Sequence, residues 1–180
     1  VGIPLGDVWR ALLGSDVDPT TVKIVRDIRL VKALVAIATG VALSVSGLLM
    51  QTLFRNPLAG PYVLGISSGA SLGVAIFILG APILGLAANS MGTAVGIAGA
   101  AWVGSARILV VIAAVSRKIK DIMVILILGM MFSSGVSALV QVLQYLSNEE
   151  ALKSFVIWTM GSLGDVTASQ LWLLIPAVVL

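Results

Sequence analysis

Cysteine and histidine are both absent from this chain of 180 residues, and only 11% of its residues are charged. The first two absences exclude disulfides, thiol nucleophiles, imidazole bases and the ligands that most often hold haem or soft metals. Soluble domains contain about 25% charged residues, so this shortage of charge argues against an ordinary soluble protein. We therefore predict no catalytic residues, no metal site and no cofactor bound by this chain.

Long charge-free runs take the place of the missing charges. Asp, Glu, Lys and Arg are absent from 33–54, 56–106 and 122–148, and 59% of all residues are hydrophobic. A helix of about 20 apolar residues crosses the hydrocarbon core of a bilayer. The sequence therefore predicts an all-α, polytopic membrane protein. Its net charge of +3 indicates loops at a membrane surface and not a nucleic-acid partner.

Glycine and proline divide these runs into about four full spans. The predicted transmembrane domain, 33–180, has full spans at about 33–54, 61–80, 92–116 and 122–146, a short external helix at 149–160 and a truncated span at 166–180. The second span should begin at Pro61, which suits a first helical position. A capping box at 147–150 should start the short helix. The chain begins at Val1 without Met and stops at Leu180 inside an apolar run, so we expect a piece of a longer protein.

An external amphipathic segment, 1–32, precedes the first span. Its apolar residues fall on one face of a short helix, at the positions Leu5, Val8, Trp9, Leu12 and Leu13. Gly14 should end this helix, and the residues up to Thr21 are typical of a loop. Such a helix is suited to lie along the membrane surface.

Basic residues near the span ends indicate the orientation. The turns at 55–61 and 117–121 carry four of them in few residues: Arg55, Arg117, Lys118 and Lys120. The opposite side carries more basic residues, but they are spread over longer segments and mixed with acids. The density near the span ends favours the first side as cytoplasmic.

The fourth span carries a stripe of polar and sulfur-containing residues on one face. The stripe consists of Met130, Ser134, Ser137, Gln141 and Gln144. Polar side chains in a membrane helix avoid lipid, so this face meets either other helices or water. The two glutamines favour a solvated translocation pathway, which an uncharged lining would leave open to a bulky solute.

Two other features of the spans allow a structural interpretation. Gly65, Gly69 and Gly73 form a small-xxx-small ladder, which predicts close packing of another helix. Arg107 is the one ionisable residue well inside a span; it could be functional or could extend to the membrane surface, and we do not count it as a site.

The positions of the acidic residues bear on the function. All eight acids lie at predicted span edges or in loops, so this part offers no buried carboxylate to couple transport to an ion gradient. No nucleophile–base pair or metal cluster appears, which argues against a membrane enzyme. An ion-coupled secondary transporter and a non-transporting structural subunit remain alternatives.

One stretch resembles a known family. Residues 46–70 read SGLLMQTLFRNPLAGPYVLGISSGA. This resembles the pattern S-G-x-x-x-Q-x-x-x-R-N-P-L-A-x-P-x-x-L-G-x-x-x-G-A of the FecCD-type permeases of ABC importers for iron–siderophores, haem and cobalamin. Every fixed letter is matched, including those at Gln51, Arg55, Asn56, Pro57 and Gly65.

The resemblance implies a transmembrane permease of the ten-helix cobalamin/siderophore type, of which this chain is about the first half. It implies a second permease copy, in a homodimer, two ATPases that bind ATP and Mg and carry out hydrolysis, and an external substrate-binding protein. It also implies the cytoplasmic (inner) membrane of a prokaryote and places the Met130–Gln144 helix beside the central pathway. The permease itself would not be an enzyme, and the transported ligand is not identified.

The resemblance further implies a docking site for the binding protein. The family usually reads R-L-P-R before its second helix, and the matching residues here are Arg29-Leu30-Val31-Lys32. Arg29 and Lys32 would face acidic residues of the binding protein. The lost proline blurs the start of the helix. The family's gate often has small hydroxyl residues, whereas Asp121 to Met123 occupy that place here.

Overall fold

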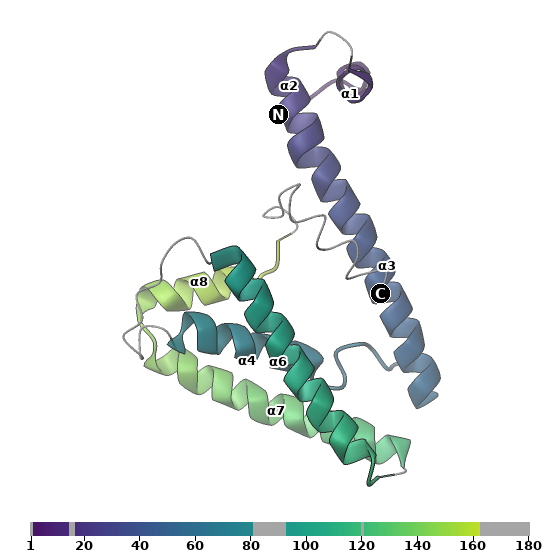
Figure 1. Cartoon of the computed structure of the whole chain (residues 1–180), viewed down its shortest axis with the longest axis vertical. Helices are drawn as coiled ribbons and strands as arrows, with labels where there is room; N and C mark the ends of the chain where they lie inside the picture. The colour runs from purple at the N-terminus through teal and green to yellow at the C-terminus, as the bar shows by residue number, and fades with distance from the viewer. Residues whose placement is uncertain (1, 15–16, 81–92, 120, 163–180) are drawn as a thin grey trace. The chain divides into compact units, whose positions relative to one another are not determined.

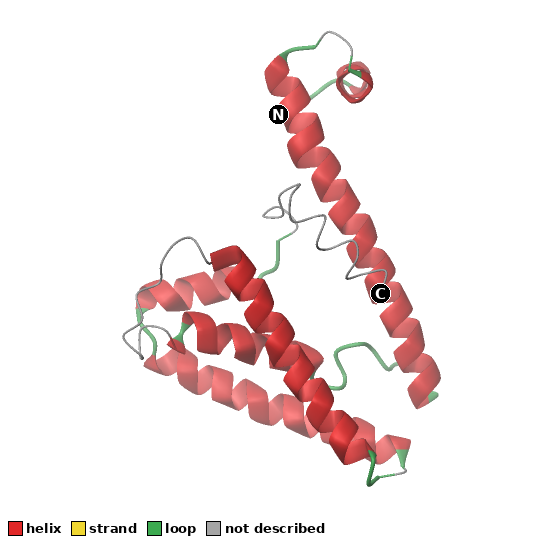
Figure 2. Cartoon of the chain, viewed as in Figure 1, coloured by secondary structure: helices red, strands yellow, loops and turns green. Residues whose placement is uncertain are grey.

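The computed structural model describes residues 2–14, 17–80, 93–119 and 121–162. All regular secondary structure in these residues is helical (Figure 2). The chain divides into two compact units: unit 1 contains residues 1–45 and 162–180, and unit 2 contains residues 46–161. Each unit is described separately below.

The described part of unit 1 contains the short helix α1 and most of a long helix that is built from three segments. The helices are α1 (Leu5–Leu13), α2 (Pro19–Lys23), the π-helical segment η1 (Ile24–Leu30) and α3 (Val31–Phe54), whose last turns belong to unit 2 (Figure 1). The last three join into one apolar helix of 36 residues, Pro19–Phe54, long enough to cross a membrane. The predicted span at 33–54 agrees with α3, but the helical chain begins earlier, at Pro19, so the prediction of a loop up to Thr21 was wrong. Pro19 takes the first helical turn, where its missing N–H costs nothing.

The amphipathic helix α1 forms as predicted and ends at Gly14, which has a φ of 81°. Ala11 of α1 and Val25 of η1 are both buried. The Arg26 guanidinium donates from Nε to the Ala11 carbonyl at 2.9 Å and from Nη2 to the Leu12 carbonyl at 3.1 Å. These bonds satisfy carbonyls that the end of a helix leaves without a partner, and they fasten α1 to η1.

The opposite face of α1 is apolar and exposed. Leu5, Trp9 and Leu13 are 79%, 63% and 78% exposed. The predicted amphipathic face is therefore present, and its position along a membrane surface remains a prediction.

Unit 2 holds the remaining helices around a short central one. They are α4 (Ile66–Ile78), α6 (Thr93–Ser116), α7 (Ile122–Leu146) and α8 (Glu149–Thr159). Helix α4 packs against α6, α7 and α8 (Figure 1). The predicted spans at 92–116 and 122–146 and the predicted helix at 149–160 agree with α6, α7 and α8. The truncated span predicted at 166–180 lies outside the described residues.

Helix α4 begins later than the sequence indicated. Residues 61–65 form turns, with Val63 N–H bonded to the Gly60 carbonyl and Gly65 N–H to the Tyr62 carbonyl. Gly65 has a φ of 78°, and the helix starts after it. Pro61 permits a helix start but does not require one, and the left-handed Gly65 interrupts the predicted span at 61–80. With 13 residues, α4 is shorter than the roughly 20 that a full span needs.

The cap of α8 is also one residue away from the predicted one. Asn148 caps the helix, because its Oδ1 accepts from Ala151 N–H at 2.9 Å. Ser147 instead donates its hydroxyl to the Gln144 carbonyl at the end of α7, at 2.9 Å. Asparagine is as strong an N-cap as serine, so Asn148 can cap α8 while the Ser147 hydroxyl bonds to the last turn of α7.

The glycines of α4 allow very close helix packing, as predicted, but they do not share one face. Gly69 and Gly73 lie against Ala100 and Gly104 of α6, and a methyl group built on Gly104 would lie 2.9 Å from the Gly69 carbonyl carbon. A methyl group on Gly65 would meet Ser133 Oγ of α7 at 2.8 Å. The predicted single ladder was therefore wrong, because Gly65 is a turn residue that contacts α7.

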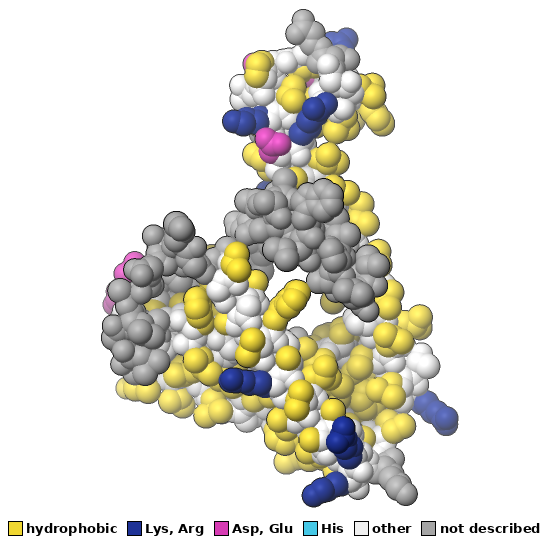
Figure 3. All heavy atoms as spheres, in the orientation of Figure 1, with side chains coloured by type: hydrophobic (Ala, Val, Ile, Leu, Met, Phe, Trp, Pro, Cys, Tyr) yellow, Lys and Arg dark blue, Asp and Glu magenta, His cyan; other side chains and the backbone are white. Residues whose placement is uncertain are grey.

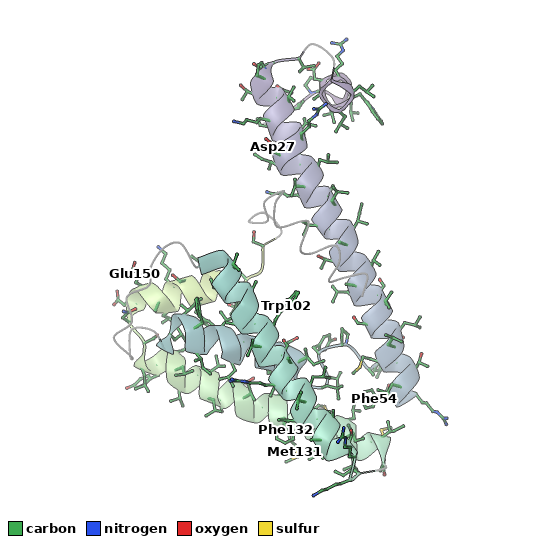
Figure 4. The ribbon with its side chains drawn as sticks, in the orientation of Figure 1. Asp27, Phe54, Trp102, Met131, Phe132 and Glu150 are labelled. Carbon is green, nitrogen blue, oxygen red and sulfur yellow. The ribbon has the colours of Figure 1, made fainter. Side chains whose placement is uncertain are left out.

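Hydrophobic side chains cover much of the visible face of unit 2 (Figure 3). They include large exposed residues such as Trp102, which is 66% exposed and projects from α6 (Figure 4). The helices α6 and α7 both meet the length and composition of membrane spans. Such a surface is suited to lipid or to further helices.

Candidate functional site: a polar groove between three helices

The polar stripe of α7 forms one wall of a groove in unit 2. The groove has a volume of about 330 Å³. Its lining comes from α4, α7 and α8: Ser67, Ser68, Ser71, Ser137, Val140, Gln141, Gln144, Phe155 and Thr159. Three of the five predicted pathway residues are therefore brought together, namely Ser137, Gln141 and Gln144.

The other two predicted pathway residues lie on α7 away from this lining. Met130 is 48% exposed, and the Ser134 hydroxyl donates to the Met130 carbonyl at 3.1 Å. Both are exposed in this chain. Val136 of the same helix is only 8% exposed and lies on a packed side of α7. Val140 is only 7% exposed and also belongs to the lining of the groove.

Sequence reasoning missed the wall formed by α4 and the contribution of α8. Ser67, Ser68 and Ser71 lie between Gly65, Gly69 and Gly73. The glycines led to an interpretation of the whole stretch as a helix-packing surface. The spacing i, i+1, i+4 on a helix was the available signal, since it puts hydroxyls on one side of α4. The sequence could not predict the contribution of Phe155, because that contribution depends on the packing of α8 against α4.

The groove is lined without any ionisable side chain. Its hydroxyls and amides can donate and accept hydrogen bonds but cannot supply a fixed charge, a general acid or a nucleophile with its base. In the described ranges, no group of three or more His, Cys, Asp or Glu residues could hold a metal ion. The arrangement suits reversible contact with a polar solute.

A second constellation is the turn that joins α3 to α4. The N–H of Asn56 bonds to the Gln51 carbonyl at 3.2 Å and the N–H of Arg55 to the Thr52 carbonyl at 3.3 Å. This pair of bonds is a Schellman cap, with Arg55 in the left-handed position at a φ of 47°.

Side chains reinforce the turn. Gln51 Nε2 donates to the Pro57 carbonyl at 3.1 Å, and Asn56 Oδ1 accepts from Leu58 N–H at 2.9 Å. The predicted motif residues Gln51, Arg55, Asn56 and Pro57 thus share one structural task, which is to end α3 and form the turn that follows it.

Comparison with known families accounts for this motif. The model of the FecCD transport family matches residues 1–180. The chain belongs to the FecCD transport family.

Relatives of this FecCD chain are bacterial permeases. It is 38% identical over 168 residues to the hemin transport system permease protein of Yersinia pestis, covering 91% of this chain and 48% of that one. It is 36% identical to the vitamin B12 import system permease protein of Klebsiella pneumoniae, covering 82% and 43%. It is 32% identical to the molybdate import system permease protein of Haemophilus influenzae, covering 86% and 44%. The chain spans about half the length of these relatives.

A solved structure shares the fold of this FecCD chain. It is a metal-chelate type ABC transporter in an inward-facing conformation, with a TM-score of 0.74 and 28% sequence identity. The match covers 92% of this chain and 54% of that one. The structure and this match confirm the prediction of an all-helical fold with helices long enough to span a membrane.

The remaining predicted residues of the FecCD chain lie outside the groove. Arg29 belongs to η1 and Lys32 to the first turn of α3, and both are exposed. Arg107 is exposed on α6. Asp121 caps α7 by accepting from Met123 N–H at 2.8 Å, so this position near the predicted gate has a structural role.

Proposed function

We propose that this chain is part of the transmembrane permease of an ATP-driven importer in the cytoplasmic membrane of a prokaryote. The observation that carries the proposal is the family match over the whole chain, together with relatives that import hemin and vitamin B12. A further relative is an iron chelatin transport permease of Helicobacter pylori. The permease itself performs no covalent chemistry.

The proposed cargo is an iron chelate, haem or a cobalamin. The molybdate permease among the relatives adds a small oxyanion to the classes that this fold transports. The groove offers no haem or metal ligand in its lining, so the metal of a chelate would remain bound by its own organic ligand during passage.

The proposed partners follow from the same family. They are a second copy of the permease, two ATPases that hold ATP and Mg, and an external binding protein that delivers the cargo. In this arrangement Met130, Ser134, Ser137, Gln141 and Gln144 line the central pathway. The groove supports that role for three of them, because Ser137, Gln141 and Gln144 lie together in its largely polar lining.

ATP dependence tests the proposal. Proteoliposomes that contain the complete permease, its ATPase and its binding protein should take up hemin, cyanocobalamin, a ferric hydroxamate or molybdate only when ATP is supplied. A proton or sodium gradient without ATP should have no effect. Uptake driven by such a gradient alone would favour a secondary transporter instead.

We also propose that Arg29 and Lys32 attract the binding protein. Arg29 lies in a π-helical segment, a rare feature that often marks functional sites. Exposed charges that attract opposite charges on a partner act mainly on the association rate, and salt screens their effect. Lysine in place of the family's second arginine lacks bidentate geometry, so the electrostatic part should dominate.

The double variant Arg29→Glu, Lys32→Glu should therefore slow association of the binding protein by about tenfold at low salt and much less at high salt. Surface plasmon resonance with the permease in nanodiscs measures the rate. Lys23→Glu, an exposed reversal on α2, is the matched control. Equal rates for the double variant and the control would mean that these residues do not face the binding protein.

A further inference from the structure

Helix α4 has two functional sides in unit 2. Gly69 and Gly73 contact α6, whereas Ser67, Ser68 and Ser71 line the groove opposite the amides of α7. The Ser105 hydroxyl of α6 donates to the Ile66 carbonyl at 3.2 Å, which fixes the start of α4 beside the groove. The packing of Gly69 and Gly73 against α6 therefore fixes the position of the serines that line the groove.

Six of the seven polar side chains that line the groove differ from the seventh, Thr159, whose hydroxyl donates to the Val156 carbonyl at 2.7 Å. Several hydroxyls elsewhere in the described residues bond to backbone carbonyls, as Ser44 does to Gly40 at 2.7 Å and Ser134 to Met130 at 3.1 Å. Among the described residues, none of six groove side chains has such a partner: Ser67, Ser68, Ser71, Ser137, Gln141 and Gln144. These six side chains are at least partly exposed in this chain, so their donors and acceptors are available to a polar occupant of the groove.

We propose that this groove is a cargo-contact subsite of the pathway and that Ser67 and Ser71 of α4 bind the cargo together with Gln141 and Gln144 of α7. The proposal rests on the proposed import function and goes beyond it by adding α4 as a second wall. Phe155 of α8 also lines the groove, but it is only 1% exposed and belongs to the hydrophobic core, so it supports the wall and offers little surface to a cargo.

The lining selects a class of chemical group. Serine hydroxyls and glutamine amides each donate and accept hydrogen bonds, and no charged residue stands among them. Amide, hydroxyl and carbonyl groups on the organic shell of a chelate match this mixture. An oxyanion such as molybdate only accepts and would leave the acceptor oxygens of the wall unpaired. The subsite therefore favours an organic chelate or cobalamin over molybdate.

Accessibility of introduced thiols tests the α4 wall. These 180 residues contain no cysteine, so Ser67→Cys and Ser71→Cys would each add a single thiol to this part of the protein. In the complete transporter, both should react with a membrane-impermeant methanethiosulfonate at least tenfold faster than Val74→Cys and Ala75→Cys. Those two control positions lie on the same helix and are 0% exposed.

The outcomes separate this inference from the proposed pathway. If Ser137→Cys reacts and the α4 thiols do not, another helix fills the α4 side and the inference is wrong while the α7 pathway stands. If Ser137→Cys is equally unreactive, the pathway proposal fails as well.

A transport measurement then tests contact with the cargo. Ser67→Ala and Ser71→Ala should each raise the KM for ATP-driven uptake about two- to tenfold, the range expected for one hydrogen bond, with little change in the maximal rate. Threonine at the same position keeps the hydroxyl and should restore the KM. Unchanged KM values in both alanine variants, measured with the chelate or cobalamin that the transporter takes up, would overturn the assignment.

Discussion

Replacing Phe155 by alanine should lower the free energy of unfolding by about 3–5 kcal/mol, the range for removing a buried aromatic ring. Phe155 is 1% exposed and belongs to a hydrophobic cluster with members from three helices of unit 2: Val74, Ala75, Leu79, Val140 and Ala151. Its ring also lies 6.0 Å from that of Trp158, centroid to centroid. The ring packs in the cluster that joins α8 to α4 and α7, so its removal should weaken the docking of α8.

Denaturant unfolding of the complete permease in detergent micelles measures this loss. The control is Ile157→Ala, two residues away on the same helix, where the side chain is 57% exposed. It should change the unfolding free energy by less than about 0.5 kcal/mol, and Phe155→Leu should recover part of the loss. Similar values for the two alanine variants would mean that α8 is not docked as described.

The substitution Gly104→Ala should cost about 1–3 kcal/mol, because it forces apart two helices in backbone contact. The added methyl group would meet the Gly69 carbonyl oxygen and would lie 3.1 Å from the Gly73 Cα. Backbone atoms cannot move aside as a flexible side chain can, so α4 and α6 must move apart. This movement would also strain the Ser105–Ile66 hydrogen bond between the two helices.

Gly99→Ala provides the matched control on the same helix. A methyl group there meets nothing within 4 Å in the described structure, and alanine favours helix over glycine by up to about 1 kcal/mol. This variant should therefore be neutral or slightly more stable. The thermal midpoint of each variant measures the difference, and a Gly104→Ala protein as stable as Gly99→Ala would contradict the close α4–α6 packing.

The sequence was most informative where one strong physical signal acts alone. Freedom from charge over 122–148 predicted a span at about 122–146, and these ends agree with α7, Ile122–Leu146. Local signals were misleading where two of them compete. Pro61 suggested a helix start, but the left-handed Gly65 places it at Ile66. Pro19 lay in a stretch that looked like a loop, yet it opens a helix that continues to Phe54.

The groove was only partly predictable for a different reason. The period of the α7 stripe identified Ser137, Gln141 and Gln144, because residues on one helix face repeat in the sequence. The opposite wall is brought close by tertiary packing, and no local pattern links Ser71 to Gln144. The contacts of Arg26 with the end of α1 depend in the same way on the return of the chain.

Blockage of ATP-driven uptake through a single thiol on α7 tests the central claim most directly. Proteoliposomes with the Ser137→Cys transporter would be assayed before and after complete modification by a membrane-impermeant methanethiosulfonate. Because Ser137 lies in the lining of the groove, modification should reduce uptake more than tenfold and should leave the transporter without this substitution unaffected. Unchanged uptake after modification has been verified by mass spectrometry would contradict a pathway along this face of α7.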